Sequence, residues 1–515
     1  MKTILISLAG DTLSHVHQLG IKEKDAFKKL EDRVTKLLST NSFLRYGQDI
    51  VSRARALMKK KETGYFDQVI AAYAEGLGVE PSRYMSFLSL LELAAHYGQI
   101  YPELKGLLPG CTSVFKLTEG AITHSRLLDF PLVGIFDEAP RLYYWQREGK
   151  PAILNYSCEG LAPLFFQAIH GNGMSFSLHH KPGHHYHRDG QSIFQITFEA
   201  LFETNNYQDF RREIKKKSSV TKWGLLLLDK SGEAQALDID GPNLNFETYN
   251  LHETTPLIFT NIPLQKELTG FESFLQFSQD RQNSIKEKLT KKDSRHILDV
   301  MTDVEEQKGR RWLHPCATLS TVGAFHVNLT NGKLHIKEGT AALVSSDAII
   351  EFSLDKHGEA IIIKKATEPK SFEKAWKRAS IAQSAFDQGD FARAYHELQI
   401  ARDLTGHPVW KEIFSFYLCL WDFLFITNNR ELSMIYKKVK SLRPPENLKD
   451  QWLMLCMRME KKLDLVPTVE SEELSYHLRD LYFKEKDASR VVFNGWMKLL
   501  YPRMEILDVF SPHHK

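Results

Sequence analysis

The chain has 515 residues, of which 43% are hydrophobic and 25% are charged, and its formal net charge is +3. This composition is that of a folded globular protein and excludes a disordered chain, while the near-balanced charge argues against nucleic acid as a partner. No apolar run reaches the roughly 20 residues that a membrane-spanning helix needs, so we expect no membrane span. The length exceeds that of one ordinary domain, and we expect two or three.

The opening residues and the cysteines bear on the compartment. Met1 to Gly10 lacks a signal-peptide cleavage pattern, so we expect a first strand that ends in a turn at Gly10-Asp11. The five cysteines form an odd and widely spaced set: Cys111, Cys158, Cys316, Cys419 and Cys456. Such a set favours neither a disulfide framework nor a zinc site, and we expect a cytoplasmic protein without metal or other cofactor.

Helical patterns dominate the rest of the first hundred residues. Residues 20–61 carry apolar side chains at helical spacing, and residues 65–75 continue as helix up to a glycine-rich stop. Pro81 stands where a first helical position would be, and residues 82–97 form an apolar helix that ends near Gly98.

The next stretch reads as a short hairpin that carries three reactive groups. A turn-prone run ends at Gly110, residues 112–117 are β-prone, and a tight turn leads into a returning strand over residues 121–124. In this hairpin Cys111 opens one strand, and Arg126 and Asp129 lie just past the end of the other. Local structure would therefore bring together a thiol, a cation and a carboxylate.

Strand patterns then continue as far as residue 364. Turn residues between alternating runs predict two hairpins, 141–146 with 152–157 and 223–229 with 234–238. A helical pattern covers residues 198–217. Further strands are expected at 174–178, 320–328, 333–337, 341–353 and 359–364. Periodicity alone supports an α+β fold class for this part of the chain.

A polar segment at residues 364–370 marks a change of composition. Beyond it nearly every run is helical, and the pattern around Gly389 predicts a tetratricopeptide-like helical hairpin at about 376–404. A plain helical cap on the preceding domain is an equal alternative. We therefore divide the chain into an N-terminal segment (1–110), a nucleophile-bearing domain (111–365) and an all-α C-terminal domain (370–515), whose helices could bind a protein partner or a second copy of the chain.

The hairpin resembles the processing site of the cysteine N-terminal-nucleophile hydrolases, in particular the acyl-coenzyme A:6-aminopenicillanic acid acyltransferase family. It is more distantly similar to acid ceramidase and choloylglycine hydrolase. Cys111-Thr112-Ser113, Arg126 and Asp129 match the motif of these families, whereas Leu127 replaces their asparagine. The resemblance implies an αββα sandwich, with two stacked antiparallel sheets between helices, followed here by the all-α domain. It also implies self-cleavage before Cys111.

The resemblance implies a two-stage chemistry on a small linear amide. The Cys111 thiol would first attack the Gly110 carbonyl, and cleavage would free an α-amine whose reference pKa is about 7.7–8.0. That amine can then act as the general base for the thiol, which forms an S-acyl enzyme. Asp129 would hold the amine and Arg126 would stabilise the thiolate. Without the resemblance, Cys111 would be taken for a buried structural thiol.

Three further residues are candidates by the same resemblance. Asn261, in Thr260-Asn261-Ile262, matches the segment whose amide binds the oxyanion, and Arg281 matches a supporting arginine. Asn172 lies where related proteins place a second contact near the nucleophile. Each also has a plain structural interpretation, as a turn asparagine or an exposed helical arginine.

Three alternatives stay open from the sequence. His124 could serve as the base of a Cys–His pair without cleavage. The fold could also be catalytically degenerate and act as a platform for the helical domain. The histidine-rich run at 179–187 invites a metal interpretation. With no cysteine or carboxylate nearby at ligand spacing, we expect there a surface loop without a functional metal.

Overall fold

The computed structural model describes residues 4–38, 64–100, 110–130, 134, 137–183, 185–253, 255–265, 272–291, 294–304, 316–353, 360–443, 448–474, 476–487 and 504. The end of the predicted 20–61 helix and the turn-prone run before Gly110 lie outside these residues. All five cysteines lie inside them, and none of the five forms a disulfide. Among the described helices, none combines the length and the apolar composition needed to cross a membrane.

In the described chain, eight strands form the first sheet, in the order β1-β4-β5-β6-β7-β8-β9-β10. The strands are β1 (Ile4–Ala9), β4 (Pro140–Gln146), β5 (Ile153–Cys158), β6 (Gln167–His170), β7 (Met174–His180), β8 (Trp223–Asp229), β9 (Glu233–Asp240) and β10 (Asn243–Asn250). Neighbours are antiparallel except β1 and β4, which pair in parallel. The expectation of purely antiparallel sheets is therefore wrong at this edge.

The second sheet is antiparallel throughout its described strands, in the order β11-β2-β3-β12-β13-β14-β15. The strands are β11 (Leu257–Phe259), β2 (Gly110–Thr118), β3 (Ala121–Asp129), β12 (Thr321–Asn328), β13 (Lys333–Glu338), β14 (Ala348–Ser353) and β15 (Ala360–Lys364). The strand expected at 341–353 is shorter than predicted, because its first residues are irregular. Strands β6, β10 and β11 were not predicted.

The β2–β3 hairpin is longer than its sequence pattern indicated. Glu119 and Gly120 both have positive φ angles (51° and 75°), as a two-residue type I′ hairpin turn requires. Cys111 pairs with Leu128. Arg126 and Asp129 therefore lie within β3, and the prediction that they lie past the end of the strand is wrong. Because β12 pairs along the other edge of β3, it extends the strand beyond what the local sequence shows.

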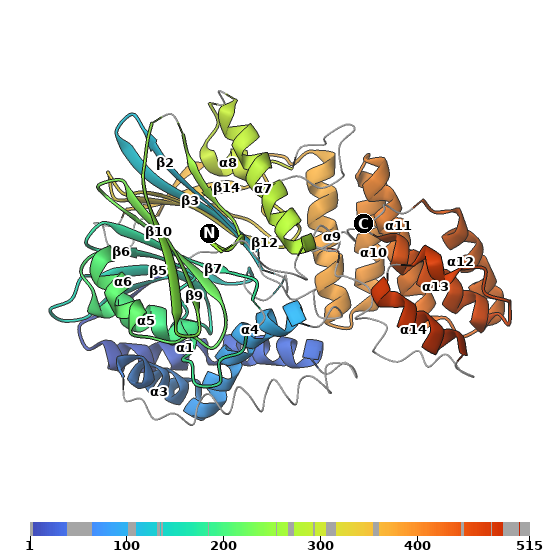
Figure 1. Ribbon diagram of the computed structural model, residues 1–515, viewed down its shortest axis with the longest axis horizontal. Helices are drawn as coiled ribbons and strands as arrows, with labels where there is room; N and C mark the ends of the chain where they lie inside the picture. The colour runs from blue at the N-terminus through green and yellow to red at the C-terminus, as the bar shows by residue number, and fades with distance from the viewer. Residues whose placement is uncertain are drawn as a thin grey trace.

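Helices cover the outer faces of both sheets (Figure 1). On the side of the first sheet lie α1 (Thr12–Leu38), α3 (Tyr65–Leu77), α4 (Pro81–Ile100), α5 (Ile193–Glu203) and α6 (Tyr207–Lys215), and on the side of the second lie α7 (Glu272–Thr290) and α8 (Ile297–Met301). This is the αββα arrangement expected from the sequence. Helices α1 and α3 approach closely at Gly20 and Gly76, where an added Cβ would meet backbone atoms at 2.4 and 2.1 Å.

The C-terminal part is helical, as predicted. Its helices are α9 (Ser371–Asp387), α10 (Phe391–Leu404), α11 (Pro408–Phe425), α12 (Asn429–Ser441), α13 (Lys449–Lys462) and α14 (Tyr476–Asp487). Helices α9 and α10 form the predicted helical hairpin, with Gly389 in its turn at a φ of 81°.

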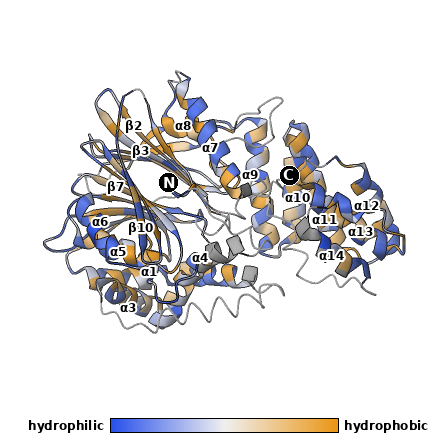
Figure 2. Cartoon of the chain, viewed as in Figure 1, coloured by the Kyte–Doolittle hydropathy of each residue, from blue (hydrophilic) through white to orange (hydrophobic). Residues whose placement is uncertain are grey.

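The apolar core continues across the predicted domain boundary at residues 365–370. One cluster of buried side chains lies mainly between the sheets and under α1, α3 and α5, and it includes Cys111 and Leu128. A second cluster contains Val114 and Leu127 on the outer face of the β2–β3 hairpin together with Trp376 of α9. Figure 2 shows the hydrophobic residues on the inner faces of these helices. The two parts of the chain therefore share buried surface.

Candidate active site

Cys111 is the second residue of β2 and points into the space between the two sheets. Its side chain is buried at 2% exposure, and its sulfur accepts a hydrogen bond from Arg126 Nη2 at 3.1 Å. The sulfur also lies 4.0 Å from the carbonyl oxygen of Leu178 in β7. The backbone nitrogen of Cys111 donates to Asn261 Oδ1 at 2.9 Å. Hydrogen bonds therefore hold both the thiol of Cys111 and the backbone nitrogen that the predicted cleavage would free.

Arg126 is a fully buried cation beside this thiol. Its guanidinium donates to the backbone carbonyl oxygens of Phe166 and Leu178 and to the sulfur of Cys111. The carbonyl oxygens accept from its Nη atoms without neutralising the charge, and Nε has no hydrogen-bond partner among the described residues. The positive charge is therefore available to stabilise negative charge that develops on the sulfur.

Asp129 lies on the opposite face of the same sheet. Successive residues of a strand point to alternate faces, and Cys111 pairs with Leu128, so the Asp129 side chain points away from the thiol and toward α7. Its carboxylate accepts from Arg281 Nη1 at 2.9 Å and from Thr321 Oγ1 at 2.6 Å. Burial raises the pKa of Asp129, while the charge of Arg281 and the Thr321 hydroxyl oppose that shift.

Arg281 joins Asp129 to the nucleophile strand. It is 1% exposed in α7, which excludes the interpretation as an exposed helical arginine. Besides Asp129, its guanidinium donates to Thr112 Oγ1 at 3.1 Å and to Asn261 Oδ1. These contacts connect Arg281 to residues next to Cys111, and its supporting role stays a prediction.

Asn261 is completely buried, and its amide orientation is determined by its neighbours. Two donors, the Cys111 nitrogen and Arg281 Nη2, meet at one side-chain atom, which must be the oxygen. The side-chain nitrogen donates to the carbonyl oxygen of His180 at 2.7 Å. Asn261 therefore holds the backbone nitrogen of Cys111 through its side-chain oxygen.

Gly110 is the first residue of β2 and pairs with Asp129. A Cβ added at this position would lie 3.1 Å from Asp129 Oδ2 and 3.3 Å from Arg281 Nη1. The predicted cleavage site thus begins with a residue that leaves space for the buried ion pair. The carboxylate of Asp129 lies beside the backbone that cleavage would open.

The structure does not bring Asn172 to this site. Asn172 lies in the exposed turn between β6 and β7, where its side-chain nitrogen donates to the carbonyl oxygen of Asn205 at 2.7 Å. Met174, the first residue of β7, follows this turn. Leu178, which contacts Arg126, lies about 13 Å further along the strand. The flanking glycines make Gly171-Asn172-Gly173 a turn, so the placement near the nucleophile is wrong.

Lys181 is a buried residue of the site that the sequence did not reveal. Its Nζ donates to the carbonyl oxygens of Thr260 and Ile262 at 2.9 and 2.6 Å, and these residues flank Asn261. Burial lowers the pKa of Lys181, and the negative charge of Asp238 opposes that shift. Sequence reasoning assigned the residue to a surface loop, and that assignment is wrong, because its side chain runs inward across β8.

Gly224 leaves room for the Lys181 side chain to cross β8, since a Cβ added at Gly224 would lie 2.3 Å from Lys181 Cε. A lysine followed by Pro-Gly carries no signal of burial. The glycine stands in the neighbouring strand β8, whose pairing with β7 the local sequence does not show.

The histidines of the hairpin region form a buried polar network next to the thiol but not with it. His124 contacts the hydroxyls of Ser113 (3.2 Å) and Ser175 (2.7 Å), and His179 contacts Ser113 at 2.8 Å. Burial lowers the pKa of both imidazoles well below the usual range. His179 and His180 belong to β7 and are buried, which corrects the expectation of a surface loop over the whole run 179–187.

Leu127 has no direct bearing on the thiol. Its side chain is fully buried in the core cluster on the outer face of the sheet, on the opposite face from Arg126 and Cys111. The replacement of the family's asparagine therefore changes packing against the outer helices rather than the space beside the sulfur.

No protein-family model matches this chain, and no curated protein matches its sequence. Solved structures do match it over half of its length. The penicillin V acylase from Agrobacterium tumefaciens aligns with 50% of this chain and 100% of its own, at 11% identity and a TM-score of 0.32. Two variants of the conjugated bile acid hydrolase from Clostridium perfringens align with 50% of this chain and 99% of theirs, at 12% identity and TM-scores of 0.30 and 0.31. At this similarity we draw neither family nor activity from them.

Proposed function

We propose that the chain is a cysteine amidohydrolase or acyltransferase that cleaves itself before Cys111 and then acts on a linear amide. The observation that carries this proposal is a pair of contacts made by Cys111. Its thiol lies 3.1 Å from a buried arginine, and its backbone nitrogen lies 2.9 Å from Asn261 Oδ1. A buried backbone N–H needs an acceptor at any residue, but a purely structural thiol would need no guanidinium beside it.

The proposed processing step uses the thiol as nucleophile on its own peptide bond. The sulfur adds to the Gly110 carbonyl carbon, the bond from that carbon to the Cys111 nitrogen breaks, and the nitrogen takes up a proton as a free amine. Water then hydrolyses the thioester, which releases the Gly110 carboxylate and regenerates the thiol. The products are residues 1–110 and a chain that begins at Cys111.

In the mature chain, the new amine is the proposed base. Asn261 Oδ1 already accepts from this nitrogen, and departure of Gly110 would open the space between the nitrogen and the Asp129 carboxylate. The amine takes the thiol proton, the thiolate attacks the substrate carbonyl, and the protonated amine donates to the leaving nitrogen. Water or an amine then accepts the acyl group from the sulfur.

The proposed oxyanion role of Asn261 depends on a change at its side chain. In this state its nitrogen donates to the His180 carbonyl oxygen. That hydrogen bond must be given up before the same N–H can stabilise a tetrahedral oxyanion. Cleavage, which frees the neighbouring backbone, is the step at which we place this change.

The intact mass of the purified protein tests the proposal. Wild type is expected to give two fragments, one ending at Gly110 and one beginning at Cys111, whereas Cys111→Ala stays whole. Cys316→Ala removes another fully buried thiol and is the matched control, which should be cleaved like wild type. A folded wild type that stays whole, or a cleaved Cys111→Ala, would exclude the processing step.

The alternative of a Cys–His pair has less support from the geometry. His124 contacts Ser113 and Ser175, and its lowered pKa makes it a poor proton acceptor at neutral pH. The binding of a protein partner or a second copy by the C-terminal helices stays a prediction. Light scattering on the purified chain over a range of concentrations separates a self-associating chain from a monomer.

A further inference from the structure

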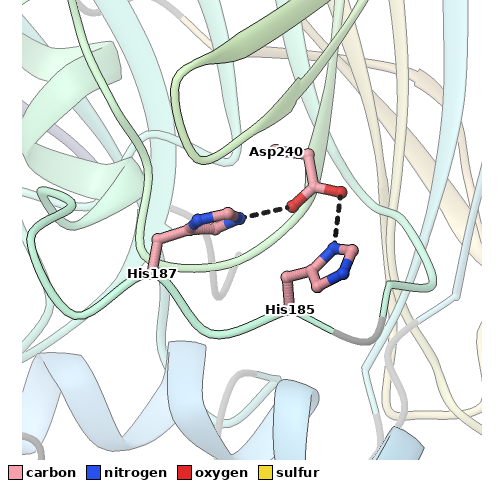
Figure 3. A group of neighbouring side chains, drawn as sticks. All are labelled: His185, His187 and Asp240. Atoms are coloured by element: carbon pink, nitrogen blue, oxygen red, sulfur yellow. Dashed lines mark hydrogen bonds and ion pairs between the residues drawn. The ribbon is translucent and has the colours of Figure 1, made fainter.

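A second group of chemically active side chains lies on the loop that follows β7 (Figure 3). His185 and His187 of this loop both face Asp240, the last residue of β9. His187 Nε2 lies 3.0 Å from one carboxylate oxygen of Asp240, and His185 Nδ1 lies 3.8 Å from the other. The three potential donor atoms lie within 4.8 Å of one another.

We propose that His185, His187 and Asp240 bind one divalent transition-metal ion, with Zn²⁺ as the best match among them. Two imidazoles and one carboxylate are a donor set that zinc accepts, and they leave a fourth position for water. Magnesium and calcium prefer all-oxygen sites and fit these ligands poorly. This proposal does not depend on the proposed chemistry at Cys111.

Two of the three ligands are held in place by the fold. The backbone nitrogen of His187 donates to the carbonyl oxygen of Val220 at 2.8 Å, and Asp240 is fixed by its strand. Gly241 has a φ of 59°, and a Cβ there would lie 2.4 Å from the imidazole of His187. A glycine is therefore needed for the ring to lie where it meets Asp240.

The third ligand is free to adjust. Ligands of a tetrahedral zinc ion at about 2.0–2.1 Å lie roughly 3.4 Å from each other. The His187–Asp240 pair, at 3.0 Å, is already that close, and the widest donor pair, which lies within 4.8 Å, must close in by at most about 1.4 Å. The side chain of His185 is 73% exposed and lies on the loop, so its rotation can supply this movement.

A nearby lysine is the competing cation. Lys222 Nζ lies 4.0 Å from Asp240 Oδ2, at the outer limit of an ion pair. Its charge partly balances the carboxylate when no metal is bound, and it would weaken metal binding by repulsion. Removal of this charge should therefore increase the affinity for the metal ion. A His–Asp surface pair that binds no metal would show no such increase.

The position of the site indicates a structural role for the ion. The same loop begins at Lys181, which supports Asn261, and β9 carries both Asp238 beside Lys181 and Asp240 at the proposed site. A metal bridge from the loop to β9 would fasten the segment that positions Lys181.

Isothermal titration of the chelator-treated protein with Zn²⁺ and Ni²⁺ tests the proposal. The protein should carry no histidine tag, and a Cys111→Ala background removes the reactive thiol as a competing ligand. We expect one ion per chain and no response to Mg²⁺. His187→Ala and Asp240→Asn should each weaken binding by more than about tenfold, which is the low end of the loss seen for outer-shell substitutions.

Two further variants keep the test decisive. His396→Ala removes an exposed histidine of α10 and should leave binding unchanged. Lys222→Met should increase the affinity for Zn²⁺. This variant tests the proposal even if His187→Ala fails to fold. The absence of saturable binding would overturn the proposal. Equal binding by His187→Ala, Asp240→Asn and His396→Ala would do so as well, since it would show an adventitious ion held elsewhere.

Discussion

At the residue scale, the side chains of the candidate site lie on two opposite faces of the β2–β3 strand pair. The thiol of Cys111 and the guanidinium of Arg126 point between the sheets, while Asp129 points outward to Arg281. The Asp129 carboxylate therefore lies on the opposite face of the strand pair from the sulfur of Cys111. Burial raises the pKa of Asp129, so its charge depends on the partner Arg281.

Substitution of His124 and of Asp129 should have opposite consequences. His124→Gln keeps a hydrogen-bonding side chain beside Ser113, so we expect self-cleavage and amide turnover within a few-fold of wild type. Asp129→Asn should lower turnover of a chromogenic N-acyl amide by roughly 10²-fold or more, since the protonated amine loses its counter-charge. It should also cost about 3–5 kcal/mol of stability, because Arg281 is left buried without its partner.

Thr321→Val is the matched control for Asp129→Asn, because it keeps the charge pair and removes only the Thr321 hydroxyl, which donates to the carboxylate and accepts from the Thr318 nitrogen. It should cost about 1–3 kcal/mol. An inactive His124→Gln beside a nearly normal Asp129→Asn would support the Cys–His pair instead of the amine base.

Lys181 is expected to act as a positioning residue for Asn261. Lys181→Met removes both hydrogen bonds to the segment around Asn261 and should slow self-cleavage by at least about tenfold, since a small misplacement of catalytic groups has large effects. The time course of fragment formation by mass spectrometry measures this. The double variant Lys181→Met/Asp238→Asn removes the buried charge on both sides and separates lost positioning from lost stability. Cleavage at the wild-type rate in a folded Lys181→Met would exclude the role.

At the element scale, α4 and α5 meet through one buried carboxylate. Glu92 of α4 accepts from the Ser192 hydroxyl at 2.8 Å, from Thr221 at 2.9 Å and from the Ile193 nitrogen at 3.2 Å, at the start of α5. Burial raises its pKa to about 7 despite these donors. The protonated form is therefore the one that the folded state prefers.

Glu92 should make the protein less stable as the pH rises. Its folded pKa of about 7 exceeds its reference value of 4.5, so its contribution is complete below pH 4.5 and is lost as the pH rises through 7. The loss is about 3 kcal/mol. Glu92→Gln mimics the protonated group, so its melting temperature relative to wild type should increase between pH 5 and pH 8. The exposed Glu119→Gln is the control, and a difference for Glu92→Gln that does not change with pH contradicts this interpretation.

At the scale of the whole molecule, the two-sheet part and the helical part share a hydrophobic core, in which Val114 and Leu127 cluster with Trp376. Trp376 of α9 is buried at 1% exposure, with Phe372 and Trp410 at ring-centroid distances of 5.6 and 5.5 Å. Lys377 of the same helix forms an ion pair with Asp347, which precedes β14. The boundary at residues 365–370 is therefore a change of composition rather than a break in packing.

Trp376→Ala should destabilise both parts together. The loss of a buried tryptophan costs about 3–5 kcal/mol, and the shared core predicts that calorimetry shows one transition at a lower temperature. Phe425→Ala, at a side chain that is 48% exposed on α11, is the control and should have little effect. A second transition that stays at the wild-type temperature would show that the two parts unfold independently.

Much of the molecule follows from the sequence because the relevant interactions are local. Hairpin turns such as Glu119-Gly120, helix ends such as Gly78 and the β-prone residues of β2 depend on local sequence, so the elements and the α+β class could be predicted. The candidate residues Cys111, Thr112, Ser113, Arg126 and Asp129 could be named from the sequence for the same reason, since one hairpin carries all of them.

Only the tertiary structure decided which distant side chains join the two candidate sites. Arg281 reaches Asp129 from α7, Lys181 reaches Asn261 across β8, and Asp240 on β9 supplies a carboxylate to His185 and His187. The prediction for Asn172 was wrong for the same reason. Its Gly-Asn-Gly turn follows from the local sequence, but this turn lies at the opposite end of β7 from Leu178. Strand order and register arise from the packing of whole sheets, and a linear pattern does not contain them.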